Sequence, residues 1–311
     1  MIKKVSTTSH EDWLSLRSKY IGGSDAAAVV GMNPFSSPYS LWAEKTGKTP
    51  PFEGNLATEV GTYLEEFIAK KFEEVTGKKV RRCNQSIFND DYPWAIANID
   101  REIVGEDAGL EIKSTSALNL KRFKNGEFPE QYYVQCVHYL AITGKKRWYL
   151  AVLIGNNDFR TFTIERDEAE IAALMSAEEA FWQKVTTNSP PEADGSKATT
   201  DAITAIDREA NDGSRTDLFG LDDKLMQYVS VTARIKELTE LKEEMANAIK
   251  AYMGESTRGE SDRFRATWSP VTRSTFDAKA FAKDHADMDL SKYYKTISSR
   301  TLKVAEINKE R

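Results

Sequence analysis

The chain contains 311 residues, of which 40% are hydrophobic, and it carries a formal net charge of −5. This length and apolar content predict one large domain with a buried core and a smaller second part. The acidic balance excludes binding to nucleic acid through a general positive field, but it allows a local basic channel. Basic residues that would permit such a channel gather at 78–82, 121–124 and 145–147.

Cysteine content and apolar runs bear on where the protein works. Cys83 and Cys136 are far apart and fit no metal or redox spacing, which excludes a four-cysteine iron–sulfur cluster and favours a reducing compartment. The N-terminus lacks the apolar run of a signal peptide, and no apolar stretch is long enough to span a membrane. We therefore expect a cytoplasmic protein without membrane association.

In chain order, helices come first and strands follow. A helix is expected over 9–20, and after the glycine pair either Ser24 or Asp25 is expected to cap a second one. Further helices are expected from Ser37-Pro38 to Gly47, over 57–76 and 128–143, and from Asp167 to about 185, with strands over 80–88, 94–104, 110–115, 147–154 and 157–165. This order predicts an α/β fold, specifically an α+β mixed sheet flanked by helices.

Composition predicts where this domain ends. We expect it to cover 1–187, a linker to cover the Pro-, Ser- and Asp-containing stretch 188–216, and a C-terminal helical extension to cover 217–311. In the extension we expect a long amphipathic helix or short coiled coil over 221–253, a strand over 264–268, a helix capped by Asp277 and a final strand over 301–305. The extension shows no site chemistry, so we interpret it as a packing, oligomerisation or partner-binding segment.

The most informative stretch runs from 94 to 114. Two short strands joined by a polar turn would bring Asp100 next to Glu111 in a hairpin. Side chains alternate along a strand, so Glu111 and Lys113 share one face while their neighbours point into a core. Two carboxylates and an ammonium on one face are suited to a Mg²⁺ or Mn²⁺ site that cuts a phosphodiester. A Glu-x-Lys pattern alone is weak evidence, since it recurs at 240–242 in a charged helix.

Two other places could contribute to such a site. Glu65 lies on an apolar face of the expected helix 57–76, where it needs either a metal or an ordinary hydrogen-bond partner. Ser24 at a helix start, with Arg17 a short distance upstream, is suited to binding phosphate, although the same residues form an ordinary helix cap. On the helix 128–143, the side chains of Tyr132, Gln135 and Tyr139 share one face.

Taken together, these motifs resemble the phage-type alkaline exonucleases, the lambda exonuclease and YqaJ-like viral recombinase group of the PD-(D/E)xK nuclease superfamily. The resemblance extends over about 13–154. It rests on Leu16-Arg17 followed by Ile21-Gly-Gly-Ser24-Asp25, on Gly61-Thr-Tyr-Leu-Glu65, on Asn98-Ile-Asp100, on Gly109-Leu-Glu111-Ile-Lys113, and on Tyr132-Tyr-Val-Gln135 continuing to Gly144. It implies a restriction-endonuclease-like core followed by the C-terminal helical extension.

The resemblance also implies a role for each site residue. Asp100, Glu111 and Lys113 would be catalytic. The metal ligands would be Glu65, Asp100, Glu111 and the backbone carbonyl of Ile112, holding two Mg²⁺ or Mn²⁺ ions in the family's manner. Arg17 and Ser24 would bind the 5′-phosphate of a DNA end, and Tyr132 and Gln135 would support the site.

The activity implied is a metal-dependent 5′→3′ exonuclease that degrades one strand of linear double-stranded DNA, for phage-type recombination by single-strand annealing. Its expected partners are double-stranded DNA ends, a single-strand annealing protein and further copies of itself in a ring. It would work in the cytoplasm of a bacterial host cell, encoded by a phage or prophage. The alternatives are an endonuclease of the same superfamily and a catalytically inactive DNA-end or protein-binding module.

Overall fold

A computed structural model describes residues 1–6, 9–207, 214–285, 288–289, 291–295 and 300–305. The chain divides into two units, Met1–Asp207 and Arg208–Arg311. The expected linker over 188–216 is therefore wrong in part. Within it, helix α7 (Lys197–Ile206) belongs to the first unit, where Thr199 and Ala202 are buried. A stretch of small and polar residues looks like a linker, yet its few apolar side chains are enough to dock one amphipathic helix.

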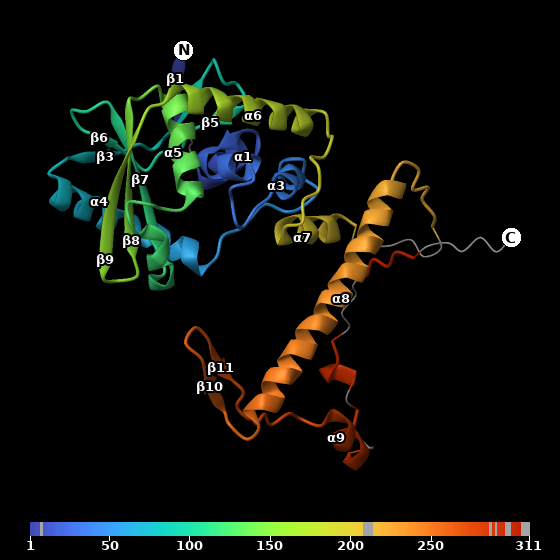
Figure 1. Ribbon diagram of the computed structural model, residues 1–311. Coiled ribbons are helices and arrows are strands. Elements are labelled where there is room, and N and C mark those ends of the chain that lie inside the picture. The colour runs from blue at the N-terminus through green and yellow to red at the C-terminus, as the bar shows by residue number, and fades with distance from the viewer. Residues whose placement is uncertain (7–8, 208–213, 286–287, 290, 296–299, 306–311) are drawn as a thin grey trace. The chain divides into compact units, whose positions relative to one another are not determined.

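The first unit is built around a mixed five-stranded sheet (Figure 1). Its strands, in spatial order, are β3 (Val80–Arg82), β6 (Arg101–Ile103), β7 (Ala108–Thr115), β8 (Arg147–Ile154) and β9 (Asp158–Glu165). Strands β7 and β8 run parallel, and the other neighbours run antiparallel. Strand β8 is an almost continuous apolar run because helices cover it on both faces. The expected mixed sheet flanked by helices is confirmed.

Helices α4 (Leu56–Thr76) and α5 (Glu130–Thr143) cover opposite faces of this sheet (Figure 1). On the α4 side, Ile68 and Phe72 pack in one cluster with Leu110 and other side chains of the sheet. The α5 side forms a separate cluster, in which Leu140 is fully buried. Because side chains alternate along β7, Leu110 and Ile112 face α4, whereas Glu111 and Lys113 face α5.

The remaining elements of this unit surround the sheet. They are β1 (Ile2–Ser6), α1 (His10–Ser18), β2 (Ile21–Gly22), α2 (Gly23–Val29), α3 (Pro38–Lys45), β4 (Gln85–Asn89), β5 (Ala95–Ile96), the 3₁₀ helix η1 (Ala117–Phe123) and α6 (Glu168–Thr186). Strand β1 pairs antiparallel with β4, and β2 pairs parallel with β5. A third cluster, around Leu41, Trp42 and Phe181, joins α2, α3, α6 and α7.

Three sequence expectations for this unit need correction. The expected strand over 80–88 is divided into β3 and β4, which pair with different strands, and the one over 94–104 is divided into β5 and β6. The cap of α2 is Gly22, whereas Ser24 and Asp25 lie inside the helix. Asp25 still serves the helix start, because its Oδ2 accepts a hydrogen bond from the backbone N–H of Gly22.

The second unit contains the helix α8 (Asp222–Met253), the hairpin of β10 (Arg258–Glu260) and β11 (Arg265–Thr267), the helix α9 (Ala278–Asp284) and the 3₁₀ helix η2 (Ser291–Tyr293). The long helix and the Asp277 cap are confirmed. The strand expected over 301–305 is wrong, since these residues have no regular structure. Among the described residues, no helix is both long and apolar enough to cross a membrane.

Candidate active site

The β6–β7 hairpin places two carboxylates side by side. Arg101 pairs with Leu110 across the hairpin, so Asp100 lies opposite the following residue, Glu111. The Oδ2 of Asp100 accepts a hydrogen bond of 2.7 Å from the backbone N–H of Ile112, which fixes the aspartate against β7. The pairing expected from the sequence is present, because strand alternation and the hairpin turn together determine which side chains meet.

Glu111 is almost completely buried, at 2% exposure, and only one of its oxygens has protein partners. Its Oε1 lies 2.5 Å from Nζ of Lys113 and accepts a 2.8 Å hydrogen bond from Nε2 of Gln135. Its Oε2 is buried and has no hydrogen-bond partner in the part of the chain that the structure describes. A buried carboxylate oxygen left without a partner is costly, so this atom is one that a bound cation could satisfy.

The charge states of Asp100 and Lys113 follow from this crowding. Burial raises the pKa of Asp100 well above its ordinary value, and the carboxylates of Glu111 and Glu65 raise it further against the opposing effect of Lys113. Burial alone would lower the pKa of Lys113, but Glu111 and Asp100 outweigh it and raise that pKa. Lys113 therefore stays charged, and the acids form a concentration of negative potential that a cation would relieve.

Glu65 does not join the other two acids in a three-carboxylate cluster. It forms an ion pair with Nη1 of Arg101, which also donates to the backbone carbonyl of Asp100. Among the described residues, no three His, Cys, Asp or Glu side chains are arranged to hold a metal ion. The sequence analysis missed Arg101, whose side chain is only 3% exposed. A buried arginine almost always has an acidic partner, so an arginine within an expected strand was the available sign that a nearby acid is paired.

Without Glu65, the carboxylate oxygens of Asp100 and Glu111 still suit a hard divalent cation. Asp100 and Glu111 lie opposite each other across the hairpin, both offer carboxylate oxygens, and Oε2 of Glu111 lacks a partner among the described residues. Carboxylate oxygens of this kind are what Mg²⁺ and Mn²⁺ prefer. The backbone N–H of Ile112 is used by Asp100, and the ligand role expected for its carbonyl stays a prediction.

Helix α5 presents a polar face to the site. Gln135 uses one N–H on Glu111 and the other on the hydroxyl of Tyr139, at 2.8 and 2.9 Å. The ring of Tyr132 lies 5.5 Å from Nζ of Lys113, within range of a cation–π interaction. The three side chains expected to share a face therefore do so, and that face is turned toward β7.

The glycine at the start of α2 allows this helix to approach α5 closely. A Cβ atom on Gly23 would lie 2.5 Å from the ring of Tyr139, which is closer than real Cβ contacts. The next residue, Ser24, is exposed, and its Oγ accepts a 2.7 Å hydrogen bond from Nη2 of Arg17. The structure thus brings together the two residues predicted to bind a 5′-phosphate, directly after the glycine that packs against Tyr139 of α5.

Beneath this region lies a buried pair that the sequence did not reveal. The imidazole of His138 and the carboxylate of Glu178 are both completely buried, with Nδ1 2.8 Å from Oε1. The other ring nitrogen of His138 lies 3.0 Å from the carbonyl oxygen of Ile96. This pair fixes α5 to α6 and to β5, and we interpret it as part of the scaffold.

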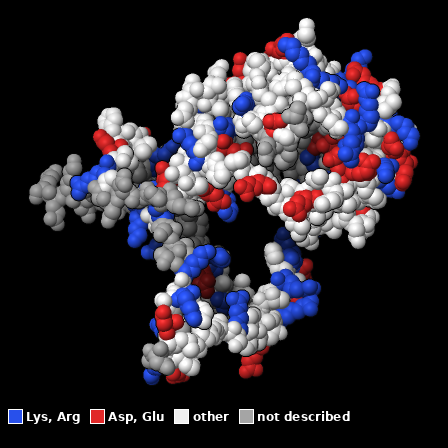
Figure 2. Space-filling model, turned by 180° about the vertical axis from the view of Figure 1, so that it is seen from behind, with Lys and Arg blue, Asp and Glu red and all other residues white. Residues whose placement is uncertain are grey.

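The basic surface clusters have less free positive charge to offer a nucleic acid than the sequence alone indicates. On the face that Figure 2 shows, acidic and basic side chains are interspersed. In the clusters 78–82 and 145–147, six basic side chains form ion pairs: Lys78 with Glu106, Lys79 with Glu73, Arg81 with Glu102, Arg82 with Glu66, Lys145 with Asp107, and Arg147 with Glu106 and Glu165. Exposed pairs of this kind neutralise local charge and add little stability.

Comparison with known proteins gives the family. Residues 12–146 match the model of the YqaJ-like viral recombinase domain. The chain is 38% identical over 293 residues to the uncharacterized protein YqaJ of Bacillus subtilis (strain 168), covering 93% of this chain and 92% of that one.

Similar solved structures include an alkaline exonuclease, LHK-Exo, from Laribacter hongkongensis, at 22% identity and a TM-score of 0.49 over 57% of this chain and 93% of that one. A phage-related exonuclease from Haemophilus somnus 129PT has 13% identity and a TM-score of 0.43, covering 57% of this chain and 99% of its own. The match to YqaJ spans nearly the whole of both chains. The chain therefore belongs to the YqaJ-like viral recombinase family.

Proposed function

We propose that the chain is a metal-dependent 5′→3′ exonuclease that degrades one strand of linear double-stranded DNA from a 5′-phosphorylated end. The observation that carries this proposal is the buried carboxylate of Glu111 beside Asp100, with one oxygen held by Lys113 and Gln135 and the other without a partner among the described residues. Such an arrangement suits hydrolysis of a phosphodiester, in which negative charge must be balanced at the reacting phosphate.

Each residue then has a definite task. Asp100 and Glu111 would hold one or two Mg²⁺ or Mn²⁺ ions, which supply an activated water and charge neutralisation when bound. Glu111 and Asp100 raise the pKa of Lys113, so we assign to Lys113 the orientation of the water or a phosphate oxygen and the stabilisation of developing negative charge, ahead of general-base catalysis. Gln135 fixes the rotamer of Glu111, and Tyr132 lies against Lys113.

Arg17 and Ser24 would bind the terminal phosphate. An arginine fork and a hydroxyl are well suited to a phosphate dianion, and here they are already in contact with each other. Binding the end in this way would restrict cutting to 5′-phosphorylated termini and set the direction of degradation.

The family is that of viral recombinases, which supports a role in DNA recombination. Removal of one strand from its 5′ end leaves a single-stranded 3′ tail, the substrate of a single-strand annealing protein. We propose such a protein as the partner, in the cytoplasm of a bacterial host. A ring of identical chains around DNA would keep a net-acidic protein on its substrate, and we propose a homo-oligomer on that ground.

The test is digestion of linear duplex labelled at one end, with and without a 5′-phosphate, in Mg²⁺ and in EDTA. We expect progressive loss of the 5′-phosphorylated strand in Mg²⁺ only, with covalently closed circles left intact. Equal cutting of closed circles would instead indicate an endonuclease of the same superfamily. Binding to DNA ends without cutting at any divalent-ion concentration would indicate an inactive end-binding module.

A further inference from the structure

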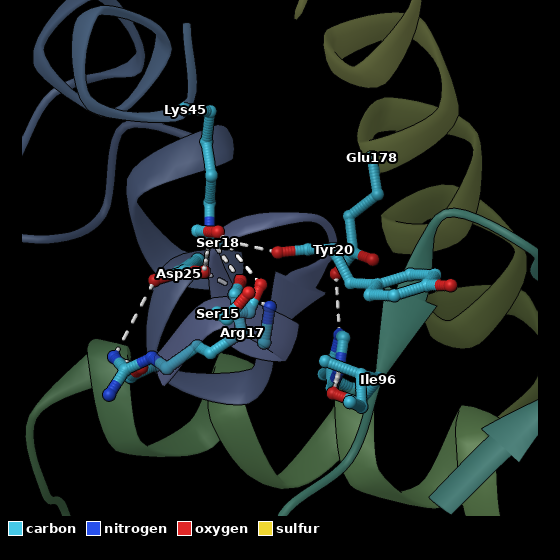
Figure 3. Close-up of polar contacts among 11 residues, drawn as sticks. Ser15, Arg17, Ser18, Tyr20, Asp25, Lys45, Ile96 and Glu178 are labelled. Carbon is cyan, nitrogen blue, oxygen red and sulfur yellow. Dashed lines mark hydrogen bonds and ion pairs between the residues drawn. The ribbon is translucent and has the colours of Figure 1, made fainter. Parts of the chain in front are cut away.

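A buried lysine lies directly behind the proposed phosphate site. The side chain of Lys45, at the end of α3, is only 2% exposed, and its Nζ lies 2.7 Å from Oδ2 of Asp25 (Figure 3). The same ammonium donates to two backbone carbonyls, those of Arg17 at 3.1 Å and Tyr20 at 2.8 Å. An ammonium has three N–H donors, and each of these contacts can use one of them.

Lys45 and Arg17 are both near Asp25, but at different distances. Nη2 of Arg17 lies 3.9 Å from Oδ1 of Asp25, whereas it donates to Oγ of Ser24 at 2.7 Å. Burial opposes the charged form of Asp25, but Lys45 and then Arg17 outweigh it and lower the pKa of that carboxyl. Asp25 is therefore a buried carboxylate, and its short ion pair is with Lys45, not with Arg17.

Removing the lysine would leave a buried charge that needs another cation. A buried ion pair that loses one member leaves an uncompensated charge, which proteins relieve by rearrangement or by a change in protonation. Arg17 is the other cation within 4 Å of Asp25 among the described ion pairs. A guanidinium drawn onto Asp25 would leave Ser24, and the phosphate site would lose its positive charge.

We propose that Lys45 is a positioning residue for end recognition: it neutralises Asp25, and so keeps the guanidinium of Arg17 directed at Ser24, where the terminal phosphate binds. This inference rests on the phosphate-binding role proposed above for Arg17 and Ser24. Lys45 itself does not touch DNA, because its side chain is buried and its ammonium is engaged by Asp25 and two carbonyls.

The experiment compares four proteins: wild type, Lys45→Met, the double variant Lys45→Met with Asp25→Asn, and Lys48→Met as a control. Lys48 is an exposed lysine three residues further on, over the ring of Trp42, so its loss removes the same charge without touching Asp25. Affinity for duplexes with and without a 5′-phosphate is measured by fluorescence anisotropy in Ca²⁺ in place of Mg²⁺, with circular dichroism as the check on folding.

We expect the preference for the 5′-phosphate to fall roughly tenfold or more in Lys45→Met, the size expected for loss of one charge-assisted hydrogen bond. The double variant should regain most of it, because a neutral amide in place of the Asp25 carboxylate cannot attract Arg17 as strongly, and Lys48→Met should match wild type. An unchanged preference in folded Lys45→Met, or no recovery in the double variant, would overturn the inference.

A crystal structure of Lys45→Met separates this inference from the proposed function. We expect Nη2 of Arg17 to leave Ser24 and to form a direct ion pair with Asp25, whatever the protein binds. A wild-type protein without any preference for 5′-phosphate would contradict the end-recognition role. Arg17 remaining on Ser24 in the variant structure would contradict the positioning role of Lys45.

Discussion

Gln135 donates a hydrogen bond from Nε2 to the buried Oε1 of Glu111 across 2.8 Å, and this contact joins helix α5 to strand β7. Its second amide N–H is used by the hydroxyl of Tyr139 at 2.9 Å. Both donors of the amide are therefore committed, and the glutamine cannot turn without breaking one of them. The carboxylate of Glu111 is thereby held in one orientation from the side of α5.

Replacing Gln135 by Leu should lower nuclease activity about 10- to 100-fold, the usual effect of removing a partner of a metal-binding residue. Gln135→Glu should lower it at least as much, because it places a third carboxylate beside Glu111. Initial rates on 5′-phosphorylated duplex over a range of Mg²⁺ concentrations provide the measurement. Gln131→Leu, one turn earlier on the same helix, serves as the control, and equal losses at the two positions would show that the effect is general to the helix.

Lys113→Ala should reduce cutting by about 10²- to 10⁴-fold, the range expected for loss of a group that stabilises charge in the transition state. Affinity for DNA in Ca²⁺ should change much less, since Lys113 acts on the reacting phosphate. The chain contains a matched control in Lys242→Ala, which alters the Glu-x-Lys pattern at 240–242 on the exposed helix α8. An equal loss of activity in Lys242→Ala would mean that removing any one positive charge lowers activity, and that the effect of Lys113→Ala is not specific to the site.

The raised pKa of Asp100 should make the stability of the folded protein depend on pH. Burial first, and then Glu111, raises this pKa above the value of about 3.9 expected in the unfolded chain. Between pH of about 3.9 and the raised pKa of the folded state, the folded protein binds more protons than the unfolded chain. The free energy of unfolding therefore falls as the pH rises through this window. Asp100→Asn cannot ionise and can still accept from the N–H of Ile112. It should have a higher melting temperature than wild type at neutral pH in EDTA.

The difference between Asp100→Asn and wild type should disappear near pH 4, where wild-type Asp100 is protonated in the folded state. Thermal unfolding followed by circular dichroism at both pH values measures it. Asp107→Asn lies in the turn of the same hairpin with its side chain 55% exposed, and it should melt like wild type. A neutral-pH melting temperature for Asp100→Asn at or below that of wild type would show that this carboxylate is not strained by its surroundings.

The sequence predicted those parts of the site that depend on local periodicity. The position of Asp100 opposite Glu111 follows from two short strands and a turn, and the shared face of Tyr132, Gln135 and Tyr139 follows from helical spacing. Both are determined by residues close together in the chain. The long helix α8 and the Asp277 cap were predictable for the same reason.

Partners chosen by tertiary packing were not predictable. Nothing near Glu65 in sequence indicates Arg101 as its partner, and nothing near Asp25 indicates Lys45, because both pairs join separate elements. The sequence predicted one strand over 94–104, yet 97–100 lies between two short strands that pair in different sheets. Helix α7 was hidden because its composition is that of a linker, although Ala202 is buried.

A divalent cation should stabilise the protein independently of any activity. A ligand that binds only the folded state adds free energy of unfolding that grows with its concentration, about 2.7 kcal/mol at a hundred times its dissociation constant. Mg²⁺ or Mn²⁺ should therefore raise the melting temperature of wild type in a saturable way. The double variant Asp100→Asn with Glu111→Gln should not respond, because it removes both carboxylates and with them the oxygen that has no partner among the described residues.

The control for this measurement is Glu240→Gln on α8, a 68% exposed glutamate of the matched Glu-x-Lys pattern, which should respond to the ion as wild type does. NaCl at equal ionic strength should produce only a small change, because screening acts on exposed charges and little on buried ones. An equal shift in wild type and in the double variant would place the ion elsewhere. The metal-dependent part of the proposal would then lose its basis, while the hydrogen bond from the backbone N–H of Ile112 to the side chain at position 100 would be unaffected, since an amide oxygen accepts it as well as a carboxylate does.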